Sequence, residues 1–395
     1  MEITQQVQYI INTLEHAGYE AYIVGGCVRD IIRGAKPKDW DIASSATPVQ
    51  AKALFKRVID TGIKHGTITV LLDKKHYEVT TYRIDGQYLD GRRPETVTFT
   101  SNITSDLSRR DFTMNAIAYN PAKGFADPFN GIDDINSKII RCVGNPIHRF
   151  TEDALRMLRA IRFAGTTGFI ICNNLLEAIT VLKSNLQNVS PERIREELVK
   201  LVTSQNPEAI GFLCSTGLMP YVLCGINYNG NINNVIRWLA ACPVAEPLRM
   251  ALFLYWSGEN CKNILRALRF DNKAIKEISL YVEMLHIPLP TTRYQIKKIL
   301  RLTSPALFEN ILTLKTITDP SQAQFINSIR QDVADIIQKG ECFTLRDLAV
   351  DGNILAEMGV PRGVAMGNHI EKLLDLVMQN PELNTRQILL GVPHE

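Results

Sequence analysis

The feature that most constrains the fold is a change in hydrophobic pattern near Gly144. Before it, strand-like runs such as "AYIV" and "GTITVLLD" are interleaved with amphipathic segments such as "TQQVQYIINTLEHAG". Alternation with period two is typical of strands, and apolar spacing of three to four is typical of helices. After Gly144 only helical patterns remain, with start signals at Thr151 and at Ser190 followed by Pro191. We therefore predict a strand-and-helix domain followed by an all-helical region.

Local signals divide the first region further. "AYIVGG" predicts a strand that enters a turn, "CVRDIIRGA" a helix, and "WDIASSA" a second strand. "TPVQAKALFK" predicts a helix with Thr47 as N-cap and Pro48 at its first position. "GTITVLLD" and "HYEVTTYR" flank "KK" and predict a hairpin. "RIDGQYLDGRRPETV" breaks both periods and predicts a long, mobile loop.

Composition narrows the class of protein. A chain of 395 residues is too long for one core, so two to four domains are expected. Its eight cysteines include no CxxC pair, which disfavours a structural zinc site or a disulfide framework. No apolar run reaches the roughly 18 residues of a membrane span, and the N-terminus has no secretory pattern. These features predict a cytoplasmic protein without a membrane partner.

Charge is unevenly distributed. The net charge is only +3, but residues 262–315 contain ten Lys or Arg and four Asp or Glu. A basic, helical segment suits a polyanionic partner, although a solvated charged surface has the same composition. The sequence alone leaves both readings open.

Two carboxylates lie one residue apart in "GGCVRDIIRGAKPKDWD". If "DWDI" is a strand, Asp39 and Asp41 project to one side, while Trp40 and Ile42 face the core. Two carboxylates aimed at one point favour a hard cation such as Mg²⁺, which bridges to substrate phosphates. The upstream Gly-Gly turn would let backbone N–H groups approach a triphosphate, with Arg29 adding charge. The alternative is that Asp39 and Asp41 only keep an exposed strand edge soluble.

This arrangement resembles the nucleotidyltransferase signature of the DNA polymerase beta superfamily. That superfamily often supplies a third carboxylate from a neighbouring strand, and Glu78 in "YEVTT" has the right apolar flanks. Four further motifs follow in order and narrow the resemblance to the class II tRNA nucleotidyltransferases, the bacterial CCA-adding enzymes. They are "SRRDFTMNAIAY", "DPFNGIDDINSKIIRCVG", "RFTEDALRMLRAIRFAG" and "VSPERIREELVKLV". The likeness is strong over residues 20–202 and fainter beyond them.

The resemblance implies an α+β protein, in which a small α/β nucleotidyltransferase head with a mixed or antiparallel sheet precedes helical domains. We expect a catalytic head over residues 1–143, a neck that recognises the nucleotide base over 144–205, a body over 206–290 and a tRNA-binding tail over 291–395. The implied activity is template-independent addition of C, C and A to the tRNA 3′ end from CTP and ATP, with Mg²⁺ as cofactor. Contacts with the acceptor and T-arm region are implied too, and the oligomeric state stays open, a homodimer included.

Base selection is assigned by the resemblance to Asp153 and Arg156 in "EDALR". A carboxylate accepts from an exocyclic amino group and a guanidinium donates to ring nitrogens or carbonyls, which suits C and A. Residues three apart on a helix share a face, so an ordinary surface ion pair is the alternative. Around this pair the expected site has metal ligands and nucleotide contacts. The metal ligands and catalytic residues are Asp39 and Asp41, and the nucleotide contacts are Gly26, Arg29, Arg110, Asp153, Arg156, Arg159 and Arg162.

Three other functions compete with full CCA addition. A bacterial poly(A) polymerase shares head and neck, but those enzymes usually read EDPVR and carry basic extensions. In a split system one enzyme adds CC and another adds A. The CC-adding members lack the loop at 82–94, so its presence here favours full CCA addition but also allows an A-adding enzyme. In this loop Gly86 and Gly91 are candidate hinges, and the candidate partners of the base-reading pair are Asp85, Asp90, Arg92 and Arg93. A catalytically inactive RNA-binding or nucleotide-sensing protein is disfavoured by the intact motifs. Some relatives carry a fused His-Asp phosphohydrolase domain, but no His-Asp dipeptide occurs in this sequence, so such a domain is not expected.

Overall fold

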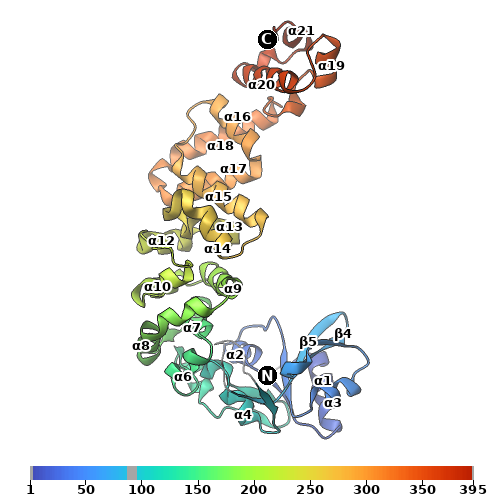
Figure 1. Cartoon of the computed structure of the whole chain (residues 1–395), viewed down its shortest axis with the longest axis vertical. Helices are drawn as coiled ribbons and strands as arrows, with labels where there is room; N and C mark the ends of the chain where they lie inside the picture. Colours follow the sequence, from blue (N-terminus) through green and yellow to red (C-terminus); the bar gives the residue numbers. More distant parts are fainter. Residues whose placement is uncertain (1–2, 87–95, 394–395) are drawn as a thin grey trace. The chain divides into compact units, whose positions relative to one another are not determined.

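The computed structural model describes residues 3–86 and 96–393. The chain forms two compact units. The first contains Met1–Ala240 and Lys262–Asn272, and the second contains Ala241–Cys261 and Lys273–Glu395. The seven-stranded sheet lies in the N-terminal, blue to teal part of Figure 1, whereas the yellow to red part is helical. The predicted α+β class, with a strand-containing head and helices after it, is therefore confirmed. The four predicted domain ranges stay predictions.

A seven-stranded mixed sheet forms the centre of the head, in the order β3-β4-β5-β2-β1-β8-β9. Neighbouring strands are antiparallel except for β2 and β5, which run parallel. The strands are β1 (Ala21–Val24), β2 (Asp41–Ser44), β3 (Val58–Gly62), β4 (Thr67–Leu72), β5 (Lys75–Thr81), β8 (Ala118–Asn120) and β9 (Gly124–Ala126).

Apolar residues explain why the central strands form. All four residues of β1 are buried, and Tyr22 and Val24 pack with Ala43 of β2 and with Tyr82 in one hydrophobic cluster. The predicted hairpin of β4 and β5 is present, but its turn lies at Asp73 and Lys74 rather than at the two lysines. Both turn residues have positive φ, as a tight two-residue hairpin turn requires.

The predicted loop after β5 is partly wrong. Arg83–Asp85 forms β6 and pairs antiparallel with β7 (Val97–Phe99), so backbone pairing overrides the weak local pattern at both ends. The middle of the loop, residues 87–95, lies outside the described residues, and with it the expected roles of Gly91, Asp90, Arg92 and Arg93. Gly86 is described; its N–H donates a hydrogen bond to the Thr96 carbonyl at 2.9 Å.

Helices of the first unit follow the predicted start signals in most places. Thr47 caps α3 through a capping box with Gln50, and Pro191 begins α9. The helices are α1 (Gln5–His16), α2 (Gly26–Ile32), α3 (Pro48–Leu54), α4 (Ile103–Ser108), α5 (Gly131–Asn136), α6 (Pro146–Glu152), α7 (Leu155–Thr167), α8 (Asn173–Leu182), α9 (Pro191–Val202), α10 (Gly211–Ser215) and α11 (Met219–Val222). Helices α12 (Ile232–Ala241) and α14 (Cys261–Ala267) cross the division between the units. Four short 3₁₀ helices lie among them: η1 (Ile63–His65), η2 (Thr113–Asn115), η3 (Lys183–Asn188) and η4 (Pro207–Ile210).

Two predictions after Gly144 are corrected. Thr151 does not start a helix, because it lies in the last turn of α6, and α7 begins only at Leu155. The region is also not wholly helical, since β10 (Ile139–Ile140) pairs parallel with β11 (Ile170–Ile171). A two-residue strand carries no periodicity that the sequence could reveal.

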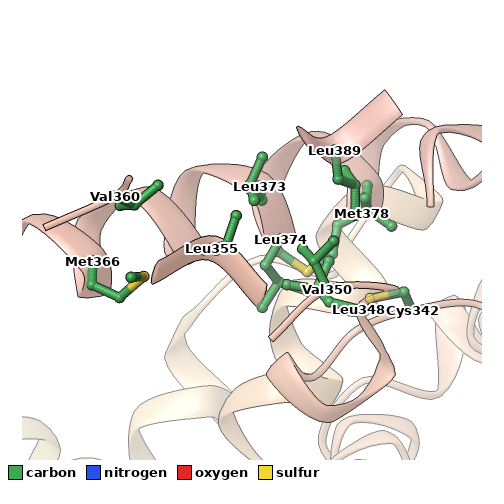
Figure 2. Packing of buried hydrophobic residues seen from close by; sticks show 11 residues of the cluster. Cys342, Leu348, Val350, Leu355, Val360, Met366, Leu373, Leu374, Met378 and Leu389 are labelled. Carbon is green, nitrogen blue, oxygen red and sulfur yellow. The ribbon is translucent and has the colours of Figure 1, made fainter. Parts of the chain in front are cut away.

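Among the described residues of the second unit, helices are the only regular secondary structure. Figure 2 shows the core at its C-terminal end, where Leu373 and Leu374 of α20 pack with Leu355 of α19 and with Leu389 of α21. Its remaining helices are α13 (Glu246–Phe253), α15 (Asn272–His286), α16 (Arg293–Leu302), α17 (Pro305–Thr318), α18 (Ala323–Gln338), α19 (Gly352–Glu357), α20 (Val364–Gln379) and α21 (Arg386–Leu390), with 3₁₀ helices η5 (Tyr255–Asn260), η6 (Pro320–Gln322), η7 (Leu345–Asp347) and η8 (Pro381–Leu383).

The basic segment 262–315 is less exposed than its composition suggests. Lys297 is only 1% exposed, and its Nζ lies 2.5 Å from Glu341 and 3.1 Å from the Met378 carbonyl oxygen. Arg301 pairs with Glu371. These two cations stabilise the helical packing, so Lys297 in particular is not a surface phosphate contact. No helix in the described ranges is both long and apolar enough to cross a membrane.

Candidate active site

A cavity of about 710 Å³ lies in the first unit and contains every residue that the sequence predicted for the site. The sheet, α2, the segment before α7, and α7 itself contribute to it. The predicted residues in its wall are Gly26, Arg29, Asp39, Asp41, Glu78, Arg110, Asp153, Arg156, Arg159 and Arg162. The structure thus brings these ten residues, which are spread from Gly26 to Arg162 in the sequence, into one cavity wall. Their roles stay predictions.

Carboxylates gather where β2 begins. Only Asp41 belongs to the strand, because Asp39 and Trp40 precede it; Trp40 is half-buried rather than in the core. Asp41 lies opposite Glu78 in the parallel register of β2 and β5. Partial desolvation in the cavity raises the pKa of both Asp41 and Glu78 although both side chains reach solvent. At Asp41 the guanidinium of Arg110 opposes this rise and the charge of Asp39 adds to it. At Glu78 the charges of Asp41 and Asp39 both add to the rise.

Hard oxygen donors that repel one another are the donor set that a divalent cation stabilises, so Asp39 and Asp41 fit such an ion. Within the described ranges, no group of three or more His, Cys, Asp or Glu side chains is arranged as a metal site, so Glu78 does not complete one. Remaining ligands of an ion at this corner would come from substrate phosphates and water.

The Gly-Gly turn places backbone next to two arginines. Gly25 has φ 74°, and a Cβ there would lie 2.9 Å from Arg110 Nη1, so any larger residue would be strained and crowded. Arg29 emerges from α2 and donates to Asn115 Oδ1 at 2.6 Å and to Asp30 Oδ1 at 2.8 Å. The turn therefore leaves room for both guanidinium groups at the cavity wall.

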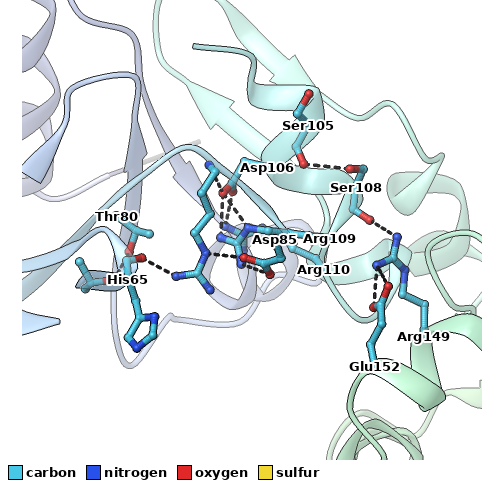
Figure 3. A network of polar contacts seen from close by, with 12 residues as sticks. His65, Thr80, Asp85, Ser105, Asp106, Ser108, Arg109, Arg110, Arg149 and Glu152 are labelled. Atoms are coloured by element: carbon cyan, nitrogen blue, oxygen red, sulfur yellow. Dashed lines mark hydrogen bonds and ion pairs between the residues drawn. The ribbon is translucent and has the colours of Figure 1, made fainter. Parts of the chain in front are cut away.

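Asp106 holds the arginines of "SRRD". Its carboxylate is fully buried and pairs with Arg109 at 2.7 Å and Arg110 at 3.1 Å (Figure 3). Burial works to raise the pKa of Asp106, but the two guanidinium groups outweigh it and lower that pKa overall. Arg109 also lies 3.7 Å from Asp85 of β6, so this network joins the base of the 82–94 loop to the cavity.

Asp153 and Arg156 do not form the predicted pair on one helix. Asp153 precedes α7 and accepts the Leu155 N–H at 3.1 Å, as a helix-capping carboxylate does. Arg193 of α9 holds Asp153 through two hydrogen bonds of 2.7 and 3.2 Å. Arg156 instead pairs with Glu152 at 2.8 Å and donates to the Arg109 carbonyl oxygen at 3.1 Å. Each member of the pair is therefore oriented by a different partner.

Arg159 and Arg162 occupy successive turns of α7 and share Glu197 of α9. Glu197 lies 3.3 Å from Arg159 and 2.7 Å from Arg162. Arg159 also pairs with Asp111 at 2.7 Å. Burial works to raise the pKa of Asp111, but Arg159 and the hydrogen bond from Asn115 outweigh it and hold that pKa at about 2. Acidic residues thus fix both arginines beside the cavity.

Several cavity residues escaped the sequence reading. Arg193 and Lys200 of α9 line the cavity. Arg109, Asn115 and Phe163 line it from other elements. A signal existed for α9, because Arg193, Glu197 and Lys200 are spaced four and three apart and share a helix face. Arg193 both lines the cavity and pairs with Asp153, a contact that spacing along α9 does not reveal.

Comparisons with known proteins agree with this geometry. Residues 21–141 match the family described as Poly A polymerase head domain, and residues 246–392 match tRNA nucleotidyltransferase domain 2. Residues 168–228 match a probable RNA and SrmB-binding site of polymerase A. A CCA-adding enzyme of Limosilactobacillus reuteri is 34% identical over 98% of this chain and 96% of its own length. One from Geobacillus thermodenitrificans is 38% identical over 91% of this chain and 89% of its own.

A solved structure extends the similarity to the whole fold. It is the Bacillus stearothermophilus CCA-adding enzyme in complex with CTP, with a TM-score of 0.84, 32% identity, and coverage of 99% of this chain and 97% of that one. A mixed sheet that carries paired carboxylates beside a glycine turn and an arginine-lined helix defines a nucleotidyltransferase. The chain belongs to the CCA-adding enzymes, a family of tRNA nucleotidyltransferases.

Proposed function

We propose that this chain adds C, C and A in turn to the 3′ end of tRNA, using CTP and ATP. In each step the oxygen of the terminal ribose hydroxyl bonds to the α-phosphorus of the nucleotide. The bond from that phosphorus to the bridging oxygen breaks, pyrophosphate leaves, and the hydroxyl proton passes to a base or to water. One observation carries the proposal. A single cavity is lined both by Asp39, Asp41 and Glu78, which we call the carboxylate corner, and by Asp153 and Arg156.

The carboxylate corner would serve the reacting phosphate. Asp39 and Asp41 would hold Mg²⁺, and two ions bound there would polarise phosphate oxygens and stabilise the attacking and leaving oxygens. The protein residues bind the nucleotide around this point. The Gly25–Gly26 turn admits the phosphate chain close to the backbone, while Arg29 and Arg110 neutralise its charge.

The base is read at the other group of residues. Asp153 would accept from the amino group that C and A share, and Arg156 would donate to the neighbouring ring atoms. Arg193 and Glu152 hold these two side chains by charge-assisted hydrogen bonds, so the reading surface is oriented before the nucleotide arrives. U and G present a carbonyl in place of the amino group and would face the carboxylate unfavourably.

Binding of CTP is supported by the relative solved with that nucleotide, which shares 32% of its residues with this chain. The tRNA partner is supported by the family itself. We place contacts with the acceptor and T-arm region in the helical part of the chain, where exposed cations such as Lys298 remain.

The test offers the protein three tRNAs, ending before the first C, after CC and after CCA, with each nucleoside triphosphate alone and in mixtures. We expect the first to gain two C and then A, the second to gain A, and the third to stay unchanged. Extension of the second alone would identify an A-adding enzyme, and long A tails would identify a poly(A) polymerase. Absence of any extension would overturn the proposal, with Asp41→Ala as the inactive reference.

A further inference from the structure

The ring of Phe163 lies among three guanidinium groups of the cavity. Its centroid is 3.5 Å from the Cζ of Arg162, 5.1 Å from that of Arg29 and 5.5 Å from that of Arg159. All three distances fall within the reach of a cation–π interaction. Phe163 is 4% exposed and lines the cavity, and its ring also packs edge to face with Phe112 at 5.6 Å.

The ring joins two separate elements of the site. Arg29 comes from α2, directly after the glycine turn, whereas Arg159 and Arg162 come from α7. Phe163 follows Arg162 in α7, so its ring brings a guanidinium of the head helix next to those of α7. Among the described residues, Arg29 makes its ion pair and side-chain hydrogen bonds with Asp30 and Asn115, and none of them reaches α7. The ring of Phe163 therefore contacts the guanidinium group of α2 and those of α7 at the same time.

An aromatic ring orients a cation differently from a carboxylate. Glu197 and Asp30 also hold Arg162 and Arg29, both at short distance, but each contributes a negative charge that cancels the cation's attraction for phosphate. The face of a benzene ring attracts a guanidinium through its quadrupole and carries no net charge. Phe163 can therefore add to the orientation of these arginines without further reducing their attraction for an anion.

We propose that Phe163 is a positioning residue for the nucleotide's triphosphate, acting through Arg29 and Arg162, in addition to its place in the core. This inference rests on the proposed function, since it takes the anion in this cavity to be the substrate phosphates. CTP and ATP carry the same triphosphate, so the effect is common to both nucleotides and separate from base selection by Asp153 and Arg156.

The experiment varies the ring's quadrupole at constant shape. Phe163 is replaced by phenylalanines with increasing numbers of ring fluorines, which withdraw electron density from the face, and separately by methionine (Phe163→Met) and tyrosine (Phe163→Tyr). KM and kcat are measured for CTP and for ATP, and thermal unfolding is recorded for each variant. Phe150 is the matched control, because it is a fully buried phenylalanine of α6 outside the cavity wall.

We expect KM for CTP and ATP to rise together, in step with fluorination, to about five-fold, the size of one cation–π contact, with kcat nearly unchanged. Phe163→Tyr keeps the wild-type KM and Phe163→Met raises it, while substitutions at Phe150 lower only the unfolding temperature. Equal KM across the fluorinated series, or a rise for one nucleotide alone, would overturn the positioning role. A wild-type protein without nucleotide addition would instead overturn the proposed function.

Discussion

Asp41 and Glu78 are register partners across the parallel strands β2 and β5, so the carboxylate corner is built by backbone pairing as well as by sequence proximity. Asp39 joins them from the segment before β2. The three carboxylates differ in their place in the fold, because Asp41 is the first residue of β2 and Glu78 lies within β5, whereas Asp39 belongs to no strand.

Removal of Asp39 or Asp41 should therefore abolish nucleotide addition. Loss of a ligand to the catalytic ion removes several kcal/mol of transition-state stabilisation, so Asp39→Ala and Asp41→Ala should retain less than roughly one per cent of the rate. Glu78→Gln should keep more than about a tenth, because it removes a neighbouring charge rather than a ligand. Labelled-CTP incorporation measures all three variants. Asp60→Ala is the control, since Asp60 of β3 is exposed and forms an ion pair with Lys52, outside the cavity wall. Rates in the Asp41 variant close to those of the control would contradict the metal-binding role.

Local sequence was informative where the chemistry lies on one short segment. The Gly-Gly turn after a buried strand, the two aspartates, and arginines at spacing three on α7 were all found from their pattern. What the sequence could not supply are contacts between distant segments. Arg193 lies 40 residues from Asp153, and no periodicity links them. Similarly, only the packing of α16 against α20 shows that Lys297 is a core residue.

The Asp153–Arg193 pair leads to a prediction about accuracy. Arg193→Ala frees the carboxylate that is expected to read the amino group, so discrimination against UTP and GTP should fall by about ten-fold, the scale of a charge-assisted hydrogen bond. The kcat/KM for each of the four nucleotides on a tRNA lacking CCA measures the effect. Arg195→Ala is the control, because Arg195 lies on the same helix and donates to the Arg269 carbonyl instead. Unchanged selectivity in both variants would remove Arg193 from base reading.

Two adjacent lysines of α16 should behave differently. Lys297→Glu buries an unpaired charge next to Glu341 and should destabilise the second unit by about 3–5 kcal/mol. Lys298 is exposed over the Tyr294 ring, so Lys298→Glu should leave the unfolding transition in place and make tRNA binding less salt-dependent, by about one unit of slope per lost phosphate contact. Thermal unfolding and binding titrations at several salt concentrations separate the two effects. A Lys298 variant with the wild-type salt slope would assign that side chain to the solvated surface.

The ion pair of Asp111 with Arg159 predicts a pH-dependent contribution to stability. Because the folded state holds the pKa of this carboxyl at about 2, below its ordinary value of 3.8, the contribution is complete above about pH 4 and disappears as the pH falls through about 2. Asp111→Asn should therefore lower the free energy of unfolding near neutral pH by about 2 kcal/mol.

The difference between Asp111→Asn and the wild type should shrink to about half by pH 3, as the carboxyl protonates more readily in the unfolded chain than in the folded one. Urea denaturation followed by circular dichroism at pH 7, 5, 4 and 3 gives the four differences. A gap that stays constant down to pH 3 would mean that the loss in Asp111→Asn does not depend on ionisation of the carboxyl, so that folding does not lower the pKa of Asp111. The low pKa of Asp111 would then have no part in holding Arg159 beside the cavity.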